Sequence, residues 1–522
     1  MRQVLRDLRF VVPTALSLGA ALSAIQPGAF LNGWAGFSVL LIMGLLSLVA
    51  LVRWGGGART LAWMTALALG LRLVAGTALY MLLPVDGYDE PDDRAGFVFT
   101  DAHRRDDQAW ELASSDAPLL AAFDRTYYTD QYGGLLALSA LTYRLLSSDA
   151  HRPLLVLSLA AIAAALGVPF FFGSTRQLWD EKLAYTATWL YCLYPESVLT
   201  GGAQMREPFL LTFTAIALWG FSKWLEARSR LSGVWLALGF GGLILTSPAV
   251  ALGLAVLLAV WLRIRGEHTR SALPLWIGGA VLFVAAFVFL AWSLSSRAEG
   301  ASTPVGIVAS WFRDSVGWVV YQLERGSGQV QNVFSKLFPA AQFVFVVAYG
   351  VTQPLLPPAI LEPTTLTWHA IGIVRSLGWY LVLPLLAYAP FAVRRREPGV
   401  PRRVWSWLIL FSWLWIILSA VRAGGDQWDN PRYRLIFFGI QALAASAAWL
   451  WWRADRDAWL PRIIAAEILC LLLFGQWYLA RYYLIGIHFP IMVVMSMCIV
   501  GVISIFLGGA LWDKRRGPPR ED

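Results

Sequence analysis

The chain has 522 residues, of which 58% are hydrophobic and only 14% are charged. An ordinary soluble domain has roughly a quarter of its residues charged, so this excess of apolar residues is too large for a soluble core. The formal net charge is +9, but the Arg and Lys residues lie in short clusters between apolar runs, which argues against a nucleic-acid-binding surface.

Apolar runs at 37–52, 154–172, 281–292 and 491–507 approach or reach the length of about 20 residues that crosses a 30 Å hydrocarbon layer. Trp and Tyr residues gather near the ends of such runs, where amphipathic rings suit the headgroup zone. The sequence therefore predicts an all-α, polytopic transmembrane helix bundle of about fourteen helices, with a range of roughly 13 to 16. They are expected near 10–26, 34–52, 60–83, 133–173 (two short helices broken near 147–153), 183–200, 205–222, 232–262 (a broken pair), 272–296, 368–393, 403–421, 435–452, 460–480 and 489–511.

The basic clusters predict the topology, because Arg and Lys favour the cytoplasmic ends of membrane helices. Both termini are then cytoplasmic, in a plasma or inner membrane, and four polar stretches share the outer face: 84–132, 201–207, 297–367 and 422–434. Met1 precedes a retained helix rather than a removed signal, and the three cysteines lie in apolar runs that do not suggest a disulfide framework. The expected parts are an N-terminal helix pair (1–59), a catalytic core (60–296), an external or re-entrant region (297–367), C-terminal helices (368–511) and a cytoplasmic tail (512–522).

The external loop 84–132 is the most acidic part of the chain, with twelve Asp or Glu residues against four Arg. For its first half, a solvated acidic loop is the favoured interpretation. Its second half, 101–113, reads as an amphipathic helix that places Asp106, Trp110 and Ala113 on one face. A carboxylate beside a Trp at the membrane interface suits chemistry on a lipid headgroup.

An acidic pair followed by an aromatic and a small residue, after a helix with "LGLRL" at 69–73, resembles the C-type (GT-C) membrane glycosyltransferases, which include protein O-mannosyltransferases and aminoarabinose transferases. The resemblance implies transfer of a sugar from a polyprenyl-phosphate donor to an acceptor hydroxyl, with inversion. It implies that Asp106 is the general base and that Asp107 replaces the usual Glu. The literal Asp-Glu pair, Asp89 and Glu90, is a rival, although Pro91 follows it directly.

Three further stretches bear on the resemblance. Glu207 matches the second acidic position of the family, although with Arg206 it is equally well read as a charge pair at a helix start. Arg432, Tyr433 and Arg434 resemble the late family pattern in which Arg-Tyr-Arg opens a helix that faces the active-site cavity. Two arginines at a helix N-terminus suit the donor phosphate; the alternative is that these arginines only snorkel at the interface. Ser247 stands where the family often has Arg, which weakens a phosphate contact there.

Other charged residues are secondary candidates. Arg72, within an apolar helix, is expected to face the protein interior and to pair with an acid of the first loop. Asp101 is a further candidate in that loop. Arg313 and His369, like Arg325, Lys336 and Arg375, are candidates for assisting the donor phosphate, but a solvated or interfacial position is favoured for each. His103, His151, His268 and His488 lack metal-ligand spacing, so no structural metal or cofactor is predicted, and use of a divalent cation stays open.

The leading hypothesis is thus a membrane glycosyltransferase with its active site on the outer face. Its expected partners are a polyprenyl-phosphate-linked sugar, the lipid bilayer and an acceptor glycan, lipid or protein, and nucleic acid is not expected. The alternatives are a lipid or solute transporter and an O-antigen polymerase or ligase. A transporter should place ionisable groups along a path across the membrane, whereas here they gather at helix ends.

Overall fold

The computed structural model describes residues 2–56, 59–124, 126–127, 132–266, 273–295, 303–311, 313–314 and 328–516, and these ranges hold α-helices, one 3₁₀-helix and connecting turns but no strand. Ten of the helices are long and apolar enough to cross a membrane, or eleven if the bent pair α20 (Asp429–Leu435) and α21 (Phe438–Asp455) counts as one span. Four shorter apolar helices accompany them, at Leu8–Ala24, Gly134–Leu146, Arg230–Thr246 and Pro339–Thr352. The prediction of an all-α, multi-pass membrane bundle is confirmed. The larger number counted from the sequence includes Leu8–Ala24, Gly134–Leu146 and Arg230–Thr246 among these shorter helices, and the stretch 183–200, which is in neither group.

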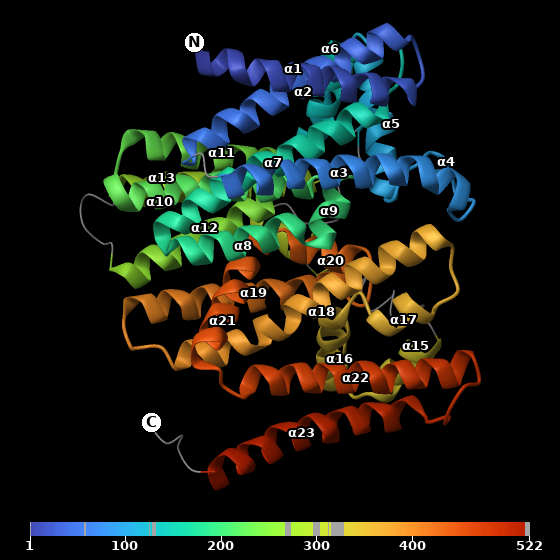
Figure 1. Ribbon diagram of the computed structural model, residues 1–522, viewed down its shortest axis with the longest axis vertical. Coiled ribbons are helices and arrows are strands. Elements are labelled where there is room, and N and C mark those ends of the chain that lie inside the picture. The colour runs from blue at the N-terminus through green and yellow to red at the C-terminus, as the bar shows by residue number, and fades with distance from the viewer. Residues whose placement is uncertain are drawn as a thin grey trace. The chain divides into compact units, whose positions relative to one another are not determined.

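The chain divides into two compact units. Unit 1 comprises Met1–Arg313 with Leu435–Leu443, and unit 2 comprises Asp314–Arg434 with Ala444–Asp522. Each is described by itself, and the helices of both appear in Figure 1.

Unit 1 is built around α7 (Pro153–Leu178), whose apolar stretch is 89% buried. Helices α2, α3 and α10 pack along it, so α7 needs no polar face, and its sequence is apolar all round. The remaining elements cover this centre. In chain order the unit contains α1 (Arg2–Ala24), α2 (Phe30–Trp54), α3 (Arg59–Asp86), α4 (Pro91–Arg94), α5 (Thr100–Ser114), η1 (Leu119–Phe123), α6 (Gly134–Leu146), α7, α8 (Glu181–Leu193), α9 (Pro195–Gly201), α10 (Glu207–Ala227), α11 (Arg230–Thr246), α12 (Pro248–Arg265) and α13 (Leu273–Leu294).

Proline sets the main helix breaks. Pro153 begins α7 after the break that follows α6, and Pro248 separates α11 from α12, as predicted for 133–173 and 232–262. Pro195 adds a break that was not predicted. Because proline lacks a backbone N–H, it divides the expected helix 183–200 into α8 and α9.

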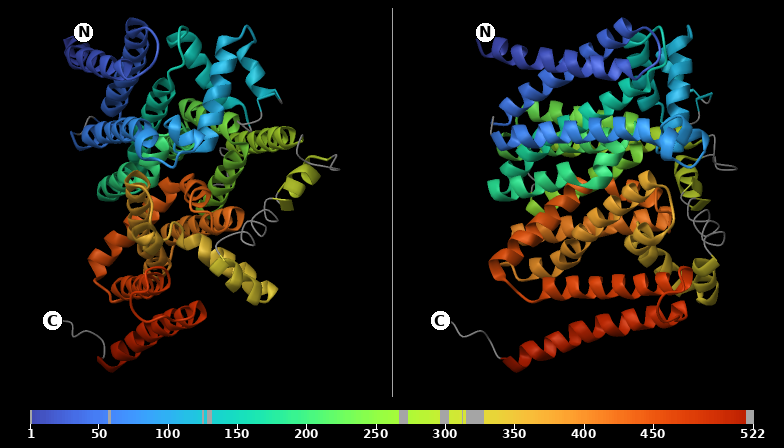
Figure 2. Two further views of the ribbon diagram at one scale, coloured as in Figure 1. Left: turned by 90° about the vertical axis from the view of Figure 1, so that its right-hand side faces the viewer. Right: turned by 45° about the vertical axis from the view of Figure 1, so that its right-hand side comes forward.

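The two ends of these helices differ in charge. Both α7 and α10 begin near the acidic first loop, and basic residues lie near their other ends, as Arg176 and Lys223 show. Helix α5 lies across the acidic end rather than along the bundle (Figures 1 and 2). This separation within unit 1 agrees with the predicted topology, while the assignment of one end to the cytoplasm stays a prediction.

Unit 2 is a second helical bundle. Within the region 297–367, predicted to be external or re-entrant, residues 339–361 form two short helices, α16 and α17, with a cis peptide bond between Gln353 and Pro354. Helix α18 packs on α17, α19 and α22, and α22 forms a hairpin with α23. The elements are α15 (Gly328–Lys336), α16 (Pro339–Thr352), α17 (Leu356–Leu361), α18 (Leu366–Arg394), α19 (Val400–Ala423), α20 (Asp429–Leu435), α21 (Phe438–Asp455, whose first turns belong to unit 1), α22 (Trp459–Tyr482) and α23 (Ile491–Arg516).

A buried arginine ties the turn between α6 and α7 to the turn between α1 and α2. The Arg152 side chain is 0% exposed; its Nη1 donates to Ser147 Oγ and Asp149 Oδ1, both at 2.7 Å. Its Nη2 donates to Asp149 Oδ2 at 2.8 Å and to the Ala29 carbonyl at 3.0 Å. Gly28 has a φ of +89°, and a Cβ atom there would lie 2.5 Å from Arg152 Nη2. The guanidinium therefore holds two turns that are far apart in sequence.

The pairing also affects the ionisation of Asp149. The hydrogen bonds from Arg152 hold the pKa of Asp149 well below its ordinary value. The folded chain therefore favours the ionised carboxylate more strongly than the unfolded chain does, and the stability of this turn depends on pH.

We expect Arg152→Ala to destabilise unit 1 by about 3 kcal/mol, because it leaves Asp149 and the Ala29 carbonyl without their buried donor. Asp149 contributes stability above its unfolded pKa of about 4, and this contribution is lost as pH falls from that value toward the lower pKa of the folded state. Thermal unfolding of the purified protein measures both effects. Lys223→Ala, which removes an exposed pair with Glu226, is the control and should cost less than about 1 kcal/mol. Equal losses from the two variants would contradict the anchoring role.

Candidate active site

Helix α5 is fixed at both ends by neighbouring side chains. At its start, Asp92 accepts a hydrogen bond from Thr100 Oγ1 at 2.5 Å and pairs with His103 Nδ1 at 2.7 Å. At its end, the Arg144 guanidinium satisfies carbonyl oxygens that have no partner within a helix, and its charge suits the C-terminal dipole. Those carbonyls belong to Leu112, Ala113, Ser115 and Ala117. These contacts determine which face of α5 points toward the inside of unit 1.

The middle of α5 is held as well. Arg105 is 5% exposed, and its Nη1 donates to the Gln204 carbonyl at 3.2 Å. Gln204 has a positive φ of 54° and its Nε2 donates to the Pro153 carbonyl at 2.9 Å. This chain of contacts joins α5 to the loop before α10 and to the first turn of α7.

The inward face of α5 carries the cluster that we call the Asp106 cluster: Asp106, Trp110, Tyr143 and His151. Tyr143 OH donates to Asp106 Oδ1 at 2.5 Å, and His151 Nε2 lies 2.8 Å from Asp106 Oδ2. The Trp110 ring stacks on the His151 ring at 5.2 Å and meets the Tyr143 ring edge-on at 5.7 Å. The Asp106 side chain is 0% exposed and His151 is 26% exposed. The prediction that Asp106 and Trp110 share one face of a helix is confirmed.

This geometry resembles an oriented acid-base pair. Both oxygens of Asp106 are occupied, so the carboxylate holds the imidazole in one orientation and favours a proton on Nε2. His151 Nδ1 is then the nitrogen left to take a proton from outside the cluster. A carboxylate that orients a histidine, which in turn removes a hydroxyl proton, is a recurring arrangement in enzymes that activate alcohols.

Asp107 and Asp101 lie elsewhere on α5. Successive helical residues are turned by about 100°, so Asp107 points away from Asp106. Its side chain is 60% exposed, and its Oδ2 lies 3.5 Å from His103 Nε2. Asp101 is exposed in the first turn. The structure therefore separates the two carboxylates of the acidic pair.

Glu207 is completely buried in the first turn of α10, followed by Pro208. The helix dipole favours a carboxylate at this position. Arg206 does not lie free beside it, since its guanidinium sits 5.5 Å from the Tyr132 ring centre. Glu196 occupies a similar buried place in the first turn of α9, although no pattern in the sequence singled it out.

The rival pair Asp89 and Glu90 is exposed. Asp89 accepts a hydrogen bond from Arg94 Nε at 2.7 Å, and this bond lowers the pKa of Asp89. A weaker carboxylate base in open solvent is less suited to removing a hydroxyl proton than a group whose pKa lies near the working pH. The geometry thus favours the second half of the loop over the first.

Arg72 faces the interior as predicted, with 1% exposure, but its expected partner was wrong. Its guanidinium donates to the Ala68 and Cys192 carbonyls at 2.9 and 3.3 Å and to Ser197 Oγ at 2.7 Å, and not to an acid of the first loop. The Pro195 break ends α8 and frees the Cys192 carbonyl from its helical bond, which gives the arginine a buried acceptor.

Two members of the Asp106 cluster were not predicted as site residues, Tyr143 and His151. His151 lies 45 residues after Asp106, so no local spacing connects them. The available signal was its position: His151, Arg152 and Pro153 directly precede an apolar run, which places a titratable ring at the end of a predicted membrane helix.

The candidate phosphate ligands lie in unit 2. Arg432 is 5% exposed, and its Nη1 pairs with Asp429 Oδ1 at 3.0 Å. Arg434 is 1% exposed; its Nη2 donates to the Gln353 carbonyl at 3.0 Å, and its guanidinium lies 3.3 Å from the Trp379 ring centre. The contacts of Arg434 hold the end of α16. The Arg422 guanidinium lies over the Tyr433 ring, 4.7 Å from the ring centre. Both candidate arginines are buried rather than spread along the interface.

Of the secondary candidates, Arg313 and Lys336 are exposed, in agreement with the solvated or interfacial position favoured for them. His369 is half-buried, with Nε2 2.9 Å from the Ile360 carbonyl. A solvated or interfacial position was wrong for Arg375, which is 3% exposed, donates to the Gln427 carbonyl at 3.0 Å and lies 4.2 Å from the Trp428 ring centre. Arg325 lies outside the described residues.

Among the described residues, no three His, Cys, Asp or Glu side chains are placed to hold one metal ion. The use of a divalent cation stays an open question.

Comparison with known proteins gives structural neighbours only. No family model and no curated protein matches the sequence. Solved structures of an oligosaccharyltransferase from Archaeoglobus fulgidus do match: AglB in complex with an inhibitory peptide and a dolichol-phosphate (13% identity, TM-score 0.39), and the apo form (12%, 0.38). The alignments cover 85% and 84% of this chain and 54% of each neighbour, so the chain spans about half of their length. At these TM-scores the likeness decides neither fold nor activity.

We expect Arg434→Ala to lower the stability of unit 2 by about 3 kcal/mol, since it removes a stacked, buried guanidinium and takes its donor from the Gln353 carbonyl at the end of α16. Arg434→Lys should restore little of this, because an ammonium lacks the planar fork. Thermal unfolding checks both, with the exposed Arg403→Ala as the control. Full stability of Arg434→Ala would contradict the anchoring of α16.

Proposed function

We propose that this chain is an integral-membrane glycosyltransferase that moves one sugar from a polyprenyl-phosphate donor to an acceptor hydroxyl on the non-cytoplasmic face. The observation that carries the proposal is the buried pairing of Asp106 with His151, in the loop where the family resemblance expects the base. A hydroxyl is a weak nucleophile, and a base within hydrogen-bond reach removes its proton as the new bond forms.

In the proposed step, the acceptor oxygen attacks C1 of the donor sugar from the side opposite the phosphate. The O–C1 bond forms as the bond from C1 to the phosphate oxygen breaks, and the electron pair leaves with the polyprenyl phosphate. The acceptor proton passes to His151 Nδ1, while Asp106 stabilises the imidazolium that results. One displacement of this kind inverts the configuration at C1.

Asp106 is thus the carboxylate on which the base depends, although its full burial means that the acceptor meets His151 first. We propose that the exposed Asp107 binds hydroxyl groups of the sugar or acceptor, and that Glu207 helps to orient them. For the leaving phosphate, Arg432 and Arg434 stay the ligands that the family resemblance predicts. Stabilising the charge that develops on that phosphate should matter as much as the base.

We expect Asp106→Asn and His151→Ala each to lower transfer by a purified protein at least about 100-fold, the size typical of losing a positioned base. The assay follows label from a radiolabelled polyprenyl-phosphate monosaccharide into an acceptor mixture or water. Asp107→Asn should raise the KM more than it lowers kcat, because its carboxylate lies outside the cluster.

Glu111→Gln, exposed on the same helix, is the matched control and should retain wild-type turnover. Wild-type rates for Asp106→Asn would reject the site. Loss with Asp106→Asn but not with His151→Ala would show that the carboxylate takes the proton directly. No turnover of any donor by a folded wild-type protein would favour a transporter.

A further inference from the structure

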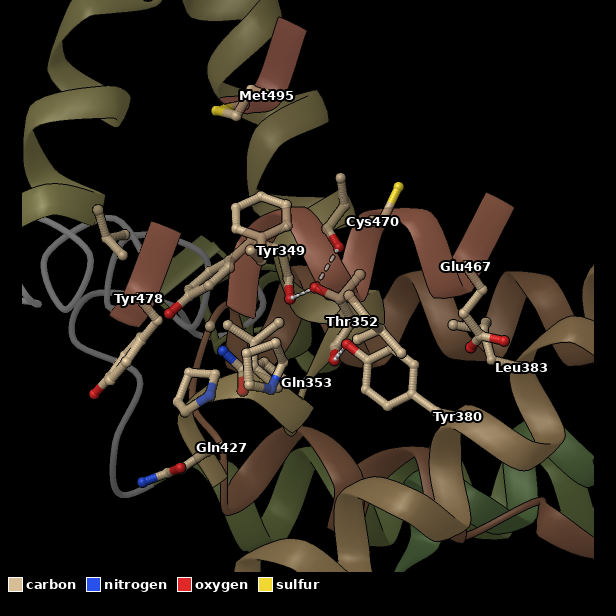
Figure 3. Close-up of a pocket in the computed structure, with 18 of the residues that line it drawn as sticks. Tyr349, Thr352, Gln353, Tyr380, Leu383, Gln427, Glu467, Cys470, Tyr478 and Met495 are labelled. Carbon is tan, nitrogen blue, oxygen red and sulfur yellow. Dashed lines mark hydrogen bonds between the residues drawn. The ribbon is translucent and has the colours of Figure 1, made fainter. Parts of the chain in front are cut away.

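Unit 2 contains a cavity of about 970 Å³ that the sequence did not predict. Residues of α16, α18, α22 and α23 line it, and Figure 3 shows side chains from its wall. Most of the wall is apolar or aromatic, as Leu383, Phe474 and Met495 illustrate. The cavity therefore suits hydrocarbon rather than a polar solute.

The cavity is elongated along the membrane-spanning helix α22. Lining residues on this helix run from Ile463 to Tyr482, a separation of about 28 Å at 1.5 Å per residue. This length is close to the hydrocarbon thickness of a bilayer, about 30 Å. The occupant that matches it is a long lipid chain.

The charge of the cavity wall excludes one class of lipid. Its ionisable side chains include the carboxyl groups of Glu362, Asp426 and Glu467, and none of the described lining residues is Lys, Arg or His. The nearby Arg375 donates to the Gln427 carbonyl and is not among the lining residues. Arg434 is also nearby, but it is not a lining residue, and its guanidinium donates to the Gln353 carbonyl and stacks on Trp379. A lipid phosphate here would face carboxyl groups with no cation in the described lining, at a depth where charges are costly to bury.

Glu467 is the polar feature of the cavity that lacks a partner. The hydroxyl groups of Thr352 and Tyr380 are satisfied, since they donate to the carbonyl oxygens of Tyr349 and Thr352 at 2.9 Å each (Figure 3). Glu467 Oε1 is buried and has no hydrogen-bond partner in the described structure. A carboxyl group at membrane depth is costly and is a functional candidate by default. In either protonation state, its oxygen accepts a hydrogen bond from a hydroxyl group.

We propose that this cavity binds an uncharged lipid alcohol, with its hydroxyl group donating to Glu467 and its hydrocarbon chain lying along α22 toward Tyr478. The site is distinct from the phosphate ligand proposed for the donor, and it stands whether or not the chain transfers a sugar. Apolar burial supplies the affinity, and the carboxyl group selects a hydroxyl over a phosphate headgroup.

The test uses the full-length protein in nanodiscs and a tritiated oleyl alcohol that carries a diazirine, with labelled peptides identified by mass spectrometry. Unlabelled oleyl alcohol and oleyl phosphate, which share a chain and differ in charge, compete for the label. We expect labelling on α16, α18, α22 or α23 and competition at least tenfold stronger by the alcohol. Equal or stronger competition by the phosphate, or labelling only elsewhere, would overturn the proposal.

Two variants test the position of the ligand. Ala466→Phe fills the cavity and should abolish labelling, whereas Ala465→Phe, on the neighbouring exposed position of α22, should not. Glu467→Leu keeps the size of the side chain and removes the acceptor, so the alcohol should compete about fivefold less well. If Ala466→Phe fails to fold, Glu467→Leu alone tests the position of the ligand. Unchanged competition by oleyl alcohol in that variant would reject the contact assigned to Glu467.

Discussion

The burial of the Arg152 guanidinium is the constraint on which the acidic end of unit 1 depends. A charge without solvent needs local hydrogen-bond partners, and the two Nη groups of Arg152 find them in Ser147, Asp149 and the Ala29 carbonyl. These bonds determine the path of the turn between α6 and α7. His151 directly precedes Arg152 in that turn, so the interactions that stabilise the turn also place the imidazole beside Asp106.

Helix α5 meets this turn with a face that is set by other contacts. Arg144 holds its end, Asp92 holds its start, and Arg105 joins its middle to the loop before α10. None of these side chains takes part in the proposed chemistry. They keep Asp106 inside, with no exposed surface, while leaving His151 partly accessible. A site that activates a hydroxyl gains from this division, because an orienting carboxylate works best when it is dry and rigid, and the base must be reachable.

Periodicity was sufficient to predict α5 and the shared helical face of Asp106 and Trp110, and the broken pair α11 and α12 was also expected from the sequence. These features depend on residues close together in sequence. The partners of buried charges could not be predicted in this way, because His151, the Ser197 hydroxyl that binds Arg72 and the ring that stacks on Arg434 are all distant in the chain. For the same reason Arg375 was expected to be solvated or interfacial but is buried against Trp428.

The central claim is that the sugar of the donor reacts at the Asp106 cluster. The most direct measurement is photolabelling of the purified protein with a polyprenyl-phosphate sugar that carries a photoreactive group on the sugar ring, followed by mapping of the labelled peptides. The account predicts label on α5 or on the turn between α6 and α7, with competition by the unmodified donor. Saturable labelling confined to other segments would contradict it.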